Sequence, residues 1–254
     1  LSAKDTRDLV LDPQAVDYEE KLLAAIAAAE YVQTHRVTLD YYTDSDAGIS
    51  GIQITSSLGV AEAGLVSMGG DRGDVWMVRV PDDNSVRYSV LRHNTQQKLY
   101  TVVNGAVTSD RMPASGSFAT NAGITRVDFA VESMDGKTTL PYTLYLIRNS
   151  ASISELSANG ETLQSKGGGY QYTETGDAKR IRLAVTANSE LAMVRIGDGE
   201  KVFASAVRDV ELNLNPVNSS VQIPVKIYTY PYDEAEASTT ILTVSQDVGK
   251  YVPA

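Results

Sequence analysis

The stretch from Pro141 to Gly160, PYTLYLIRNSASISELSANG, determines which fold the sequence predicts. Two segments with the residue types of β-strands flank a short polar break at Arg148–Ser152. A similar stretch, RVTLDYYTDSDAGISGIQIT, runs from Arg36 to Thr55, about 100 residues earlier, which is the length of one β-sandwich domain. The recurrence predicts two copies of one domain, joined at the polar break.

After about Val37, apolar residues alternate with polar residues, as expected for half-buried antiparallel strands. The four clearest runs are Trp76–Val80, Val127–Val131, Ile181–Val185 and Val221–Ile227. Turn signals rich in glycine, asparagine and aspartate separate the runs: Asp82–Asn84, Asn104–Gly105, Asp135–Gly136, Asn159–Gly160, Gly167–Gly169 and Asp198–Gly199. Many short strands with regular turns predict β-sandwiches.

The two halves can be aligned segment by segment in the same order. The matched pairs are Ile49–Ile52 with Ile153–Leu156, Val75–Asp82 with Ile181–Asn188, Tyr100–Val107 with Leu191–Glu200, and Ile124–Arg148 with Ser220–Val244. Such self-similarity is typical of domain arrays. We therefore predict an all-β protein with two tandem immunoglobulin-like β-sandwiches, at residues 37–149 and 150–254.

Residues 1–36 differ from the rest and predict a short N-terminal helical segment. Asp17 and Glu20 have the spacing of a helix-capping box, and strong helix formers follow. Tyr18, Leu22 and Ile26 recur every four residues, which would place them on one face of a helix. We expect a helix from Tyr18 to about Val32.

Several segments of the second half carry a family resemblance. They are ISELSANGETLQ (Ile153–Gln164), Gly169–Tyr170, RIRLAVTAN (Arg180–Asn188), RIGDG (Arg195–Gly199), VELNLNPVNSSVQIPVKIYT (Val210–Thr229) and TTILTVS (Thr239–Ser245). Together they resemble the cadherin-like β-sandwich modules found in tandem in bacterial surface proteins. The resemblance covers Ile153–Ser245 well and Ile49–Arg148 less closely. It implies an extracellular or cell-surface location and a role in adhesion, ligand presentation or spacing.

Composition excludes several classes of partner and site. The 254 residues suffice for two modules that each bury a core, and 43% hydrophobic with 21% charged residues is typical of globular proteins. A formal net charge of −10 disfavours binding to nucleic acid or anionic lipid. No apolar run reaches the roughly 18 residues that span a bilayer, so we predict no membrane insertion. The absence of cysteine excludes disulfides and thiolate metal sites.

The sequence contains none of the common catalytic motifs. HExxH, GxSxG and GxxxxGK are absent. The two histidines, His35 and His93, are isolated in the sequence, and we expect both to be solvated. We predict that the chain is not an enzyme and that it needs no cofactor.

Asp44 and Asp46 are candidate calcium ligands because they lie at the entry to the first predicted sandwich, and calcium binds clustered carboxylates. The corresponding position between the sandwiches, Arg148–Ser152, has no carboxylate. The alternative interpretation is that Asp44 and Asp46 belong to a solvated turn, and the missing carboxylate favours it.

Three tyrosines in the segment KIYTYPYDEAEA (Lys226–Ala237) are the candidate ligand-binding residues. Tyr228, Tyr230 and Tyr232 share the alternation of Gln222, which predicts that they lie on the face opposite the core. Exposed aromatic residues in a row can stack on sugar rings or anchor a protein partner. The alternative is that they cover a sheet edge or pack on the neighbouring module.

Three functions remain open at this point. The first is a non-enzymatic extracellular module of a bacterial surface protein that acts in adhesion, ligand presentation or spacing. The second is a carbohydrate-binding module that uses the tyrosines. The third is an accessory domain of a larger secreted enzyme or a phage structural protein. The expected partner is a protein or a glycan at the cell surface.

Overall fold

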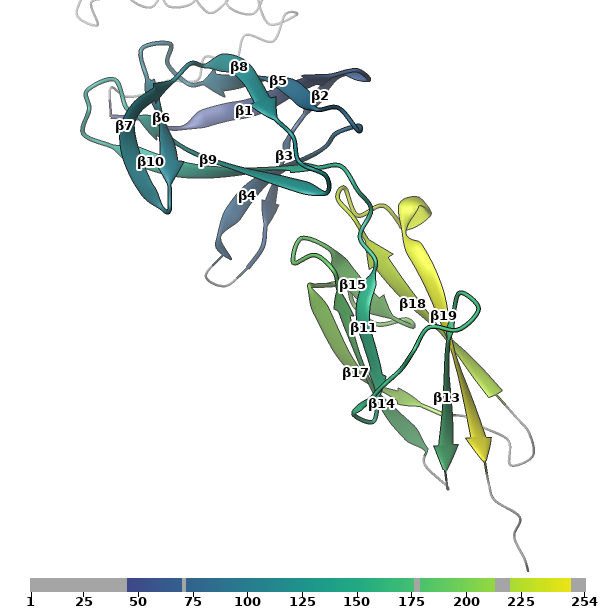
Figure 1. Cartoon of the computed structure of the whole chain (residues 1–254). Helices are drawn as coiled ribbons and strands as arrows, with labels where there is room; N and C mark the ends of the chain where they lie inside the picture. The colour runs from purple at the N-terminus through teal and green to yellow at the C-terminus, as the bar shows by residue number, and fades with distance from the viewer. Residues whose placement is uncertain (1–44, 70–71, 176–178, 213–219, 248–254) are drawn as a thin grey trace, which may run out of the picture. The chain divides into compact units, whose positions relative to one another are not determined.

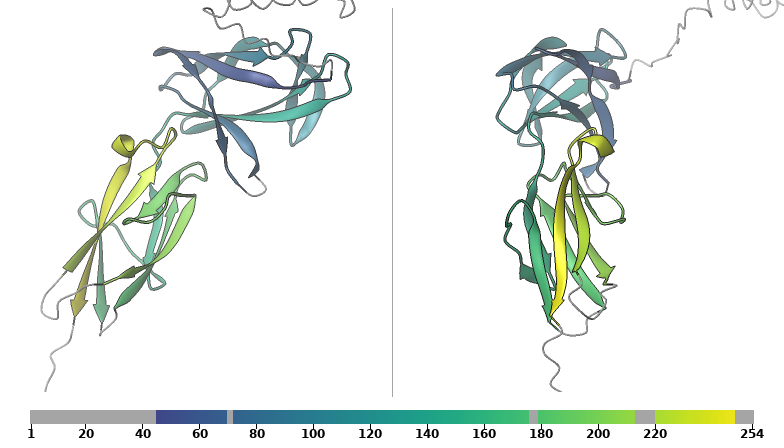
Figure 2. Two further views of the ribbon diagram at one scale, coloured as in Figure 1. Left: turned by 180° about the vertical axis from the view of Figure 1, so that it is seen from behind. Right: turned by 90° about the vertical axis from the view of Figure 1, so that its right-hand side faces the viewer.

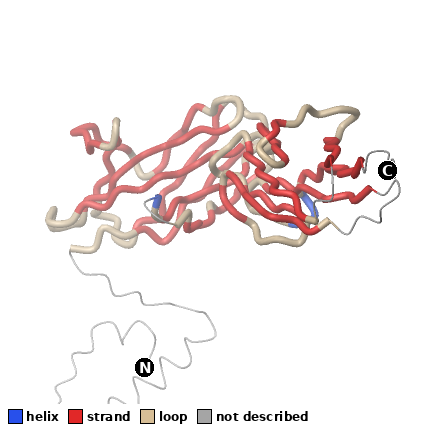
Figure 3. Tube along the Cα trace, turned by 90° about the horizontal axis from the view of Figure 1, so that it is seen from below, coloured by secondary structure: helices blue, strands red, loops and turns tan. Residues whose placement is uncertain are grey.

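The computed structural model describes residues 45–69, 72–175, 179–212 and 220–247, and this part of the chain is built mainly from β-strands (Figures 1 and 3). These strands form four sheets, in which most neighbours are antiparallel. A short 3-10 helix, η2 (Glu234–Glu236), lies between the last two strands. The predicted helix at Tyr18–Val32, and the whole segment 1–36, fall outside the described residues.

Residues up to Ile147 form two of the sheets. One contains, in spatial order, β2 (Gly59–Glu62), β1 (Ile49–Ser56), β5 (Ser85–Arg92) and β8 (Ser115–Ala119). The other contains β3 (Gly64–Ser67), β4 (Asp74–Arg79), β10 (Thr139–Ile147), β9 (Ile124–Glu132), β6 (Lys98–Val103) and β7 (Ala106–Met112).

Residues from Ile153 onward form the other two sheets. One contains β12 (Glu161–Thr162), β11 (Ile153–Ala158), β14 (Arg180–Ala187) and β17 (Ser205–Glu211). The other contains β13 (Tyr170–Thr175), β19 (Ser238–Asp247), β18 (Ser220–Tyr228), β15 (Met193–Ile196) and β16 (Val202–Phe203). Among the described strands, none that ends by Ile147 pairs with one that begins after it.

The two halves share the topology of an immunoglobulin-like sandwich, with β3 as an additional edge strand in the first half. β1 pairs with β5 as β11 pairs with β14, and β10 runs parallel to β4 as β19 runs parallel to β13. Both first strands have a register shift at the same place, at Ser50 and at Ser154. Each of these serine hydroxyls donates a hydrogen bond of 3.1 Å to a carbonyl of the partner strand. The predicted match of Ile49–Ile52 with Ile153–Leu156 is therefore confirmed.

One predicted match in the repeat is wrong. Val75–Asp82 was aligned with Ile181–Asn188, but Val75–Arg79 belongs to β4, whose counterpart in the second half is β13. The counterpart of Ile181–Ala187, in β14, is β5. Both runs alternate with period two, and alternation identifies a strand without identifying its place in the sheet.

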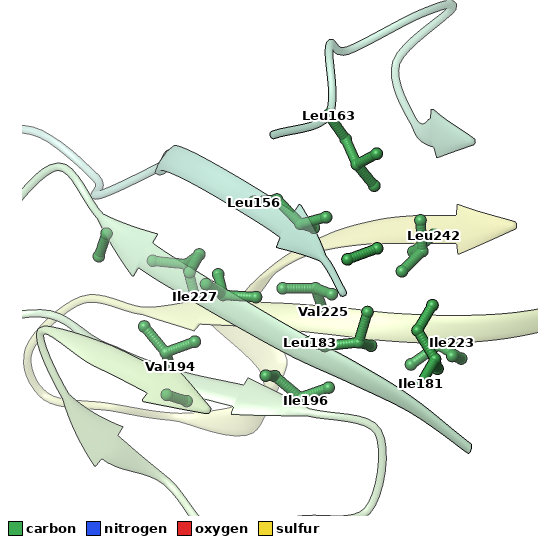
Figure 4. Close-up of a cluster of buried hydrophobic side chains, with 14 of the residues drawn as sticks. Leu156, Leu163, Ile181, Leu183, Val194, Ile196, Ile223, Val225, Ile227 and Leu242 are labelled. Atoms are coloured by element: carbon green, nitrogen blue, oxygen red, sulfur yellow. The ribbon is translucent and has the colours of Figure 1, made fainter. Parts of the chain in front are cut away.

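Each half has its own apolar core between two facing sheets (Figures 2 and 4). In the second half, Ile181, Leu183 and Val185 of β14 are fully buried against the opposite sheet, which contributes Val225 and Leu242. The inward-facing residues of the four alternating runs lie in, or pack against, these two cores, as predicted. The domain bounds 37–149 and 150–254 remain our proposal.

The connection between the last two strands differs between the halves. In the first half it is the short turn at residues 133–138, closed by the Ser133 N–H donating to the Thr138 carbonyl at 2.9 Å. In the second half it is the longer segment 229–237, which contains η2. This longer connection carries two of the three predicted site tyrosines, and we refer to it as the 229–237 connection.

Candidate functional site

The structure covers all three candidate tyrosines more than expected. Tyr228 is fully buried, and Tyr230 and Tyr232 are half-buried. The predicted exposure of Tyr228 is therefore wrong. β18 ends at Tyr228, so the alternation does not extend to Tyr230 and Tyr232, and Tyr228 itself is covered by charged side chains.

The side chain of Glu234 organises the charged groups that cover Tyr228. The Tyr228 hydroxyl donates a hydrogen bond of 2.8 Å to Oε2 of Glu234. Nη2 of Arg195 lies 2.6 Å from Oε1 of Glu234, and the Lys226 ammonium contacts the same oxygen. Nζ of Lys201 lies 4.0 Å from the centroid of the Tyr228 ring, a cation–π geometry. One carboxylate thus ties the 229–237 connection to the sheet below it.

This network shifts two pKa values in opposite directions. Burial, together with the hydrogen bond to Glu234, raises the pKa of Tyr228 to about 12. Hydrogen bonds from Lys226 and Tyr228 lower the pKa of Glu234 to about 2. Glu234 therefore stabilises the fold above its unfolded pKa near 4.5, and this contribution is lost as the pH falls towards 2.

We predict that Glu234→Gln lowers the pKa of Tyr228 from about 12 towards its ordinary value of 10. The neutral phenol is the stabilised form, so the native contribution of Tyr228 is complete below pH 10 and disappears as the pH rises through 12. Carbon-13 NMR of ring-labelled tyrosine measures this titration residue by residue. Tyr88, whose pKa is raised by burial, is the control and should titrate alike in both proteins.

Tyr230 and Tyr232 belong to an apolar cluster that joins the two halves. The Tyr232 ring makes edge-to-face contacts with Tyr230 and Phe203, each with 5.7 Å between ring centroids. Its hydroxyl donates to the Leu191 carbonyl at 2.9 Å and lies 3.2 Å from Sδ of Met77. We call this group the junction cluster; its buried members are Met68, Val75, Met77, Tyr145, Ile147 and Leu191, and Val66, Ile124, Phe203, Tyr230 and Tyr232 pack against them. Tyr230 and Tyr232 therefore match the alternative interpretation, in which the tyrosines pack on the neighbouring module.

Polar contacts accompany the junction cluster. Nη1 of Arg79, in β4, lies 3.1 Å from a carboxylate oxygen of Glu236, and its Nη2 donates to the Ser150 hydroxyl at 2.9 Å. Arg72 donates to the backbone carbonyl of Glu190 at 3.4 Å. These groups are partly exposed, so each pair contributes about 1 kcal/mol or less.

The sequence carried a signal for this contact that alternation hides. Val75–Val78 in β4 and Leu144–Ile147 in β10 are continuous apolar runs. In both strands one set of side chains enters the core of the first half and the other set enters the junction cluster. Continuous apolar runs are typical of strands that are covered on both faces.

Gly64 of the first half lies against the Tyr230 side chain. A Cβ at Gly64 would lie 2.3 Å from the Tyr230 hydroxyl oxygen. We predict that Gly64→Ala displaces the Tyr230 ring and destabilises the protein by about 1–3 kcal/mol, the usual cost of overpacking. Gly51→Ala is the matched control, because its Cβ would meet only Leu91 at an ordinary 3.6 Å. Equal unfolding free energies for the two variants, measured in urea, would contradict the prediction.

The predicted calcium site has only one ligand in the described part of the chain. Asp44 lies outside the described residues, while Asp46 is half-buried and both of its carboxylate oxygens have partners within the protein. Oδ1 of Asp46 accepts the Gly48 N–H at 2.6 Å, and Oδ2 lies 2.7 Å from Nδ1 of His93. His93 is therefore not solvated as expected, since its side chain is 20% exposed. Within residues 45–247, as far as they are described, no three metal-ligating side chains gather.

Comparisons with known proteins add little to this geometry. No family model and no curated protein matches the chain. Solved structures that are similar include the fibronectin(III)-like modules of CbhA from Clostridium thermocellum, with 12% identity over 72% of this chain and 94% of that one, at a TM-score of 0.23. Another is the N-terminal four Ig domains of Dscam1 isoform 4.4, with 13% identity over 73% of this chain and 47% of that one, at a TM-score of 0.28.

A third is SGBP-B of Bacteroides ovatus, solved with a mixed-linkage heptasaccharide, with 10% identity over 73% and 71% of the two chains and a TM-score of 0.23. Scores this low carry no argument, so the fold assignment rests on the strand pairings. In the described ranges, no helix has the length and apolar character required to cross a lipid bilayer.

Proposed function

We propose that this chain is a non-enzymatic, extracellular β-sandwich module of a bacterial surface protein, and that its main task is spacing. The observation that carries this proposal is the contact of Tyr232, from the second half, with Met77 of the first half; the hydrogen bond from Tyr232 to the Leu191 carbonyl of its own half holds the ring in place. Through it the 229–237 connection contacts the first half in addition to the covalent linker. A pair of sandwiches held in this way keeps whatever is attached to its two ends at a set separation.

Contacts of this kind decide whether a domain pair is stiff. Neighbouring domains reorient freely by default, unless the interface between them is large and apolar. Here the junction cluster contains six buried side chains, and the pair Arg79–Glu236 lies beside it. Both features support a restricted hinge at the linker between Ile147 and Ile153.

The location and the partner follow from the resemblance of Ile153–Ser245 to cadherin-like modules of bacterial surface proteins. We propose a protein or a glycan at the cell surface as the ligand that the module presents or adheres to. A role as an accessory domain of a larger secreted enzyme or a phage structural protein would use the same stiffness. Binding of glycans by Tyr228, Tyr230 and Tyr232 is not favoured, because Tyr228 is buried and the Tyr232 ring packs against the junction cluster.

Spin-label distance measurements test the spacing function directly. The chain has no cysteine, so Leu58→Cys and Ser165→Cys introduce two unique labelling sites, both at exposed positions in different halves. We expect one narrow distance distribution in frozen solution. A broad distribution, like that of two sandwiches on a free linker, would overturn the spacing function.

A further inference from the structure

A cavity of about 240 Å³ lies beside the linker, where the two halves meet. Ile124 and Ile147 of the first half and Leu191 of the second form its apolar wall. Asn149, Asn188 and Thr229 contribute polar groups to its lining. An apolar wall combined with a few convergent polar groups is the usual composition of a small-molecule site, and domain interfaces are a usual place for one.

The polar groups of the cavity retain hydrogen-bonding capacity. Oδ1 of Asn188 accepts the Ser152 N–H at 2.9 Å, and its amide nitrogen has no partner among the described residues. Oγ1 of Thr229 accepts the Ala151 N–H at 2.7 Å, so its own proton is available for donation. The side chain of Asn149 is exposed and makes no hydrogen bond within the described ranges. The cavity therefore presents donors and an acceptor, and backbone contacts hold the side chains of Asn188 and Thr229 in place.

We propose that this cavity binds one neutral sugar ring, such as the terminal residue of a glycan. No side chain in its lining is charged, which argues against an anionic or cationic ligand. Hydroxyls of a pyranose match the amide and hydroxyl groups, and its C–H face matches the wall of Ile124, Ile147 and Leu191. No aromatic ring lines the cavity, so stacking is absent and a dissociation constant of about 1 mM is expected.

A second cavity nearby has a different chemistry. It has about 280 Å³ and is lined by Arg72, Arg126 and Glu190, among others. Its charged groups already have partners, because Arg126 lies 2.9 Å from Asp128 and Arg72 contacts Glu190. The first cavity, whose lining has no charged side chain, is therefore the one with polar groups available to a ligand. Sugar binding there is independent of spacing, since stiffness of the pair requires no ligand.

Ligand-observed NMR on the full chain tests the site. The probes are the methyl glycosides of glucose and galactose and free N-acetylglucosamine, with glucuronate as the charged comparison. We expect saturation transfer to at least one neutral probe, with a Kd of about 1 mM. Glucuronate should bind at least five-fold more weakly than that probe. Asn149→Ala should weaken binding at least five-fold, and Asn149→Trp, which places a large ring at the lining, should abolish it.

Asn121→Ala is the matched control. Asn121 is exposed, lies two residues from Gly123 of the lining, and is not itself part of the lining. This variant should bind like the unchanged protein. No saturation transfer to any neutral probe at about 10 mM, ten times the expected Kd, would overturn the site. Binding that survives Asn149→Trp would equally overturn it, and in both cases the spin-label distances would still decide the spacing function separately.

Discussion

Phe129→Ala is expected to unfold the first half at a markedly lower temperature while the second half keeps its own transition. Phe129 is fully buried and stacks on Tyr142, with ring centroids 5.4 Å apart. Removing a buried phenylalanine ring costs about 3–5 kcal/mol, which is a large share of the 5–15 kcal/mol that usually stabilise a domain. The melting temperature of the affected half should fall by more than about 10 °C.

Leu183→Ala is the matching change in the second half. Leu183 is also fully buried, and its truncation should cost about 2–5 kcal/mol. Calorimetry should show that Phe129→Ala shifts one transition and Leu183→Ala shifts the other. If both variants shift a single common transition, the two cores do not fold as separate domains, and the proposed bounds 37–149 and 150–254 are wrong.

Tyr232→Ala should release the hinge between the halves. The substitution removes two edge-to-face ring contacts and the hydrogen bond to Leu191, and it leaves Met77 without its cover. Phe203, Tyr230 and Leu191 belong to the second half, so these losses destabilise the anchoring of the 229–237 connection, and the contact with Met77 is what the substitution removes from the junction. The narrow spin-label distribution between positions 58 and 165 should become broad.

The control for this variant is Tyr100→Ala. Tyr100 is a half-buried tyrosine of β6 that does not belong to the junction cluster. Its replacement should leave the distance distribution narrow. A distribution that stays narrow in Tyr232→Ala would show that the linker alone fixes the two halves, and the 229–237 connection would then have no part in spacing.

Much of the fold was predictable because alternation is a local property. The runs at Val127–Val131 and Ile181–Val185 identified strands whose inward-facing residues lie in the cores or pack against them. The place of a strand within the sheet depends on non-local pairing, and for this reason Val75–Asp82 was matched to the wrong partner. Strand-level similarity between repeats is therefore a safer guide to fold class than to strand correspondence.

The candidate site was less predictable than the fold. Alternation correctly placed Tyr228 on the face opposite the core, but it could not show that Glu234, six residues later, and Lys201 fold back over that face. The burial of Tyr230 and Tyr232 depends on a connection that leaves the strand pattern at Tyr228. The continuous apolar runs Val75–Val78 and Leu144–Ile147 were the local signs of a second buried face.

The 229–237 connection makes the pair directional. The equivalent turn at 133–138 in the first half is shorter and contains no aromatic residue, so of these two connections it is the one in the second copy that contacts the preceding sandwich. Exchanging the order of the two copies would separate Tyr232 from Met77. The two sandwiches would then stay folded but would be joined by the linker without this contact. Two modules with one topology are thus not interchangeable, because the second copy supplies Tyr232 and the first copy supplies the apolar surface around Met77, so the contact forms in this order alone.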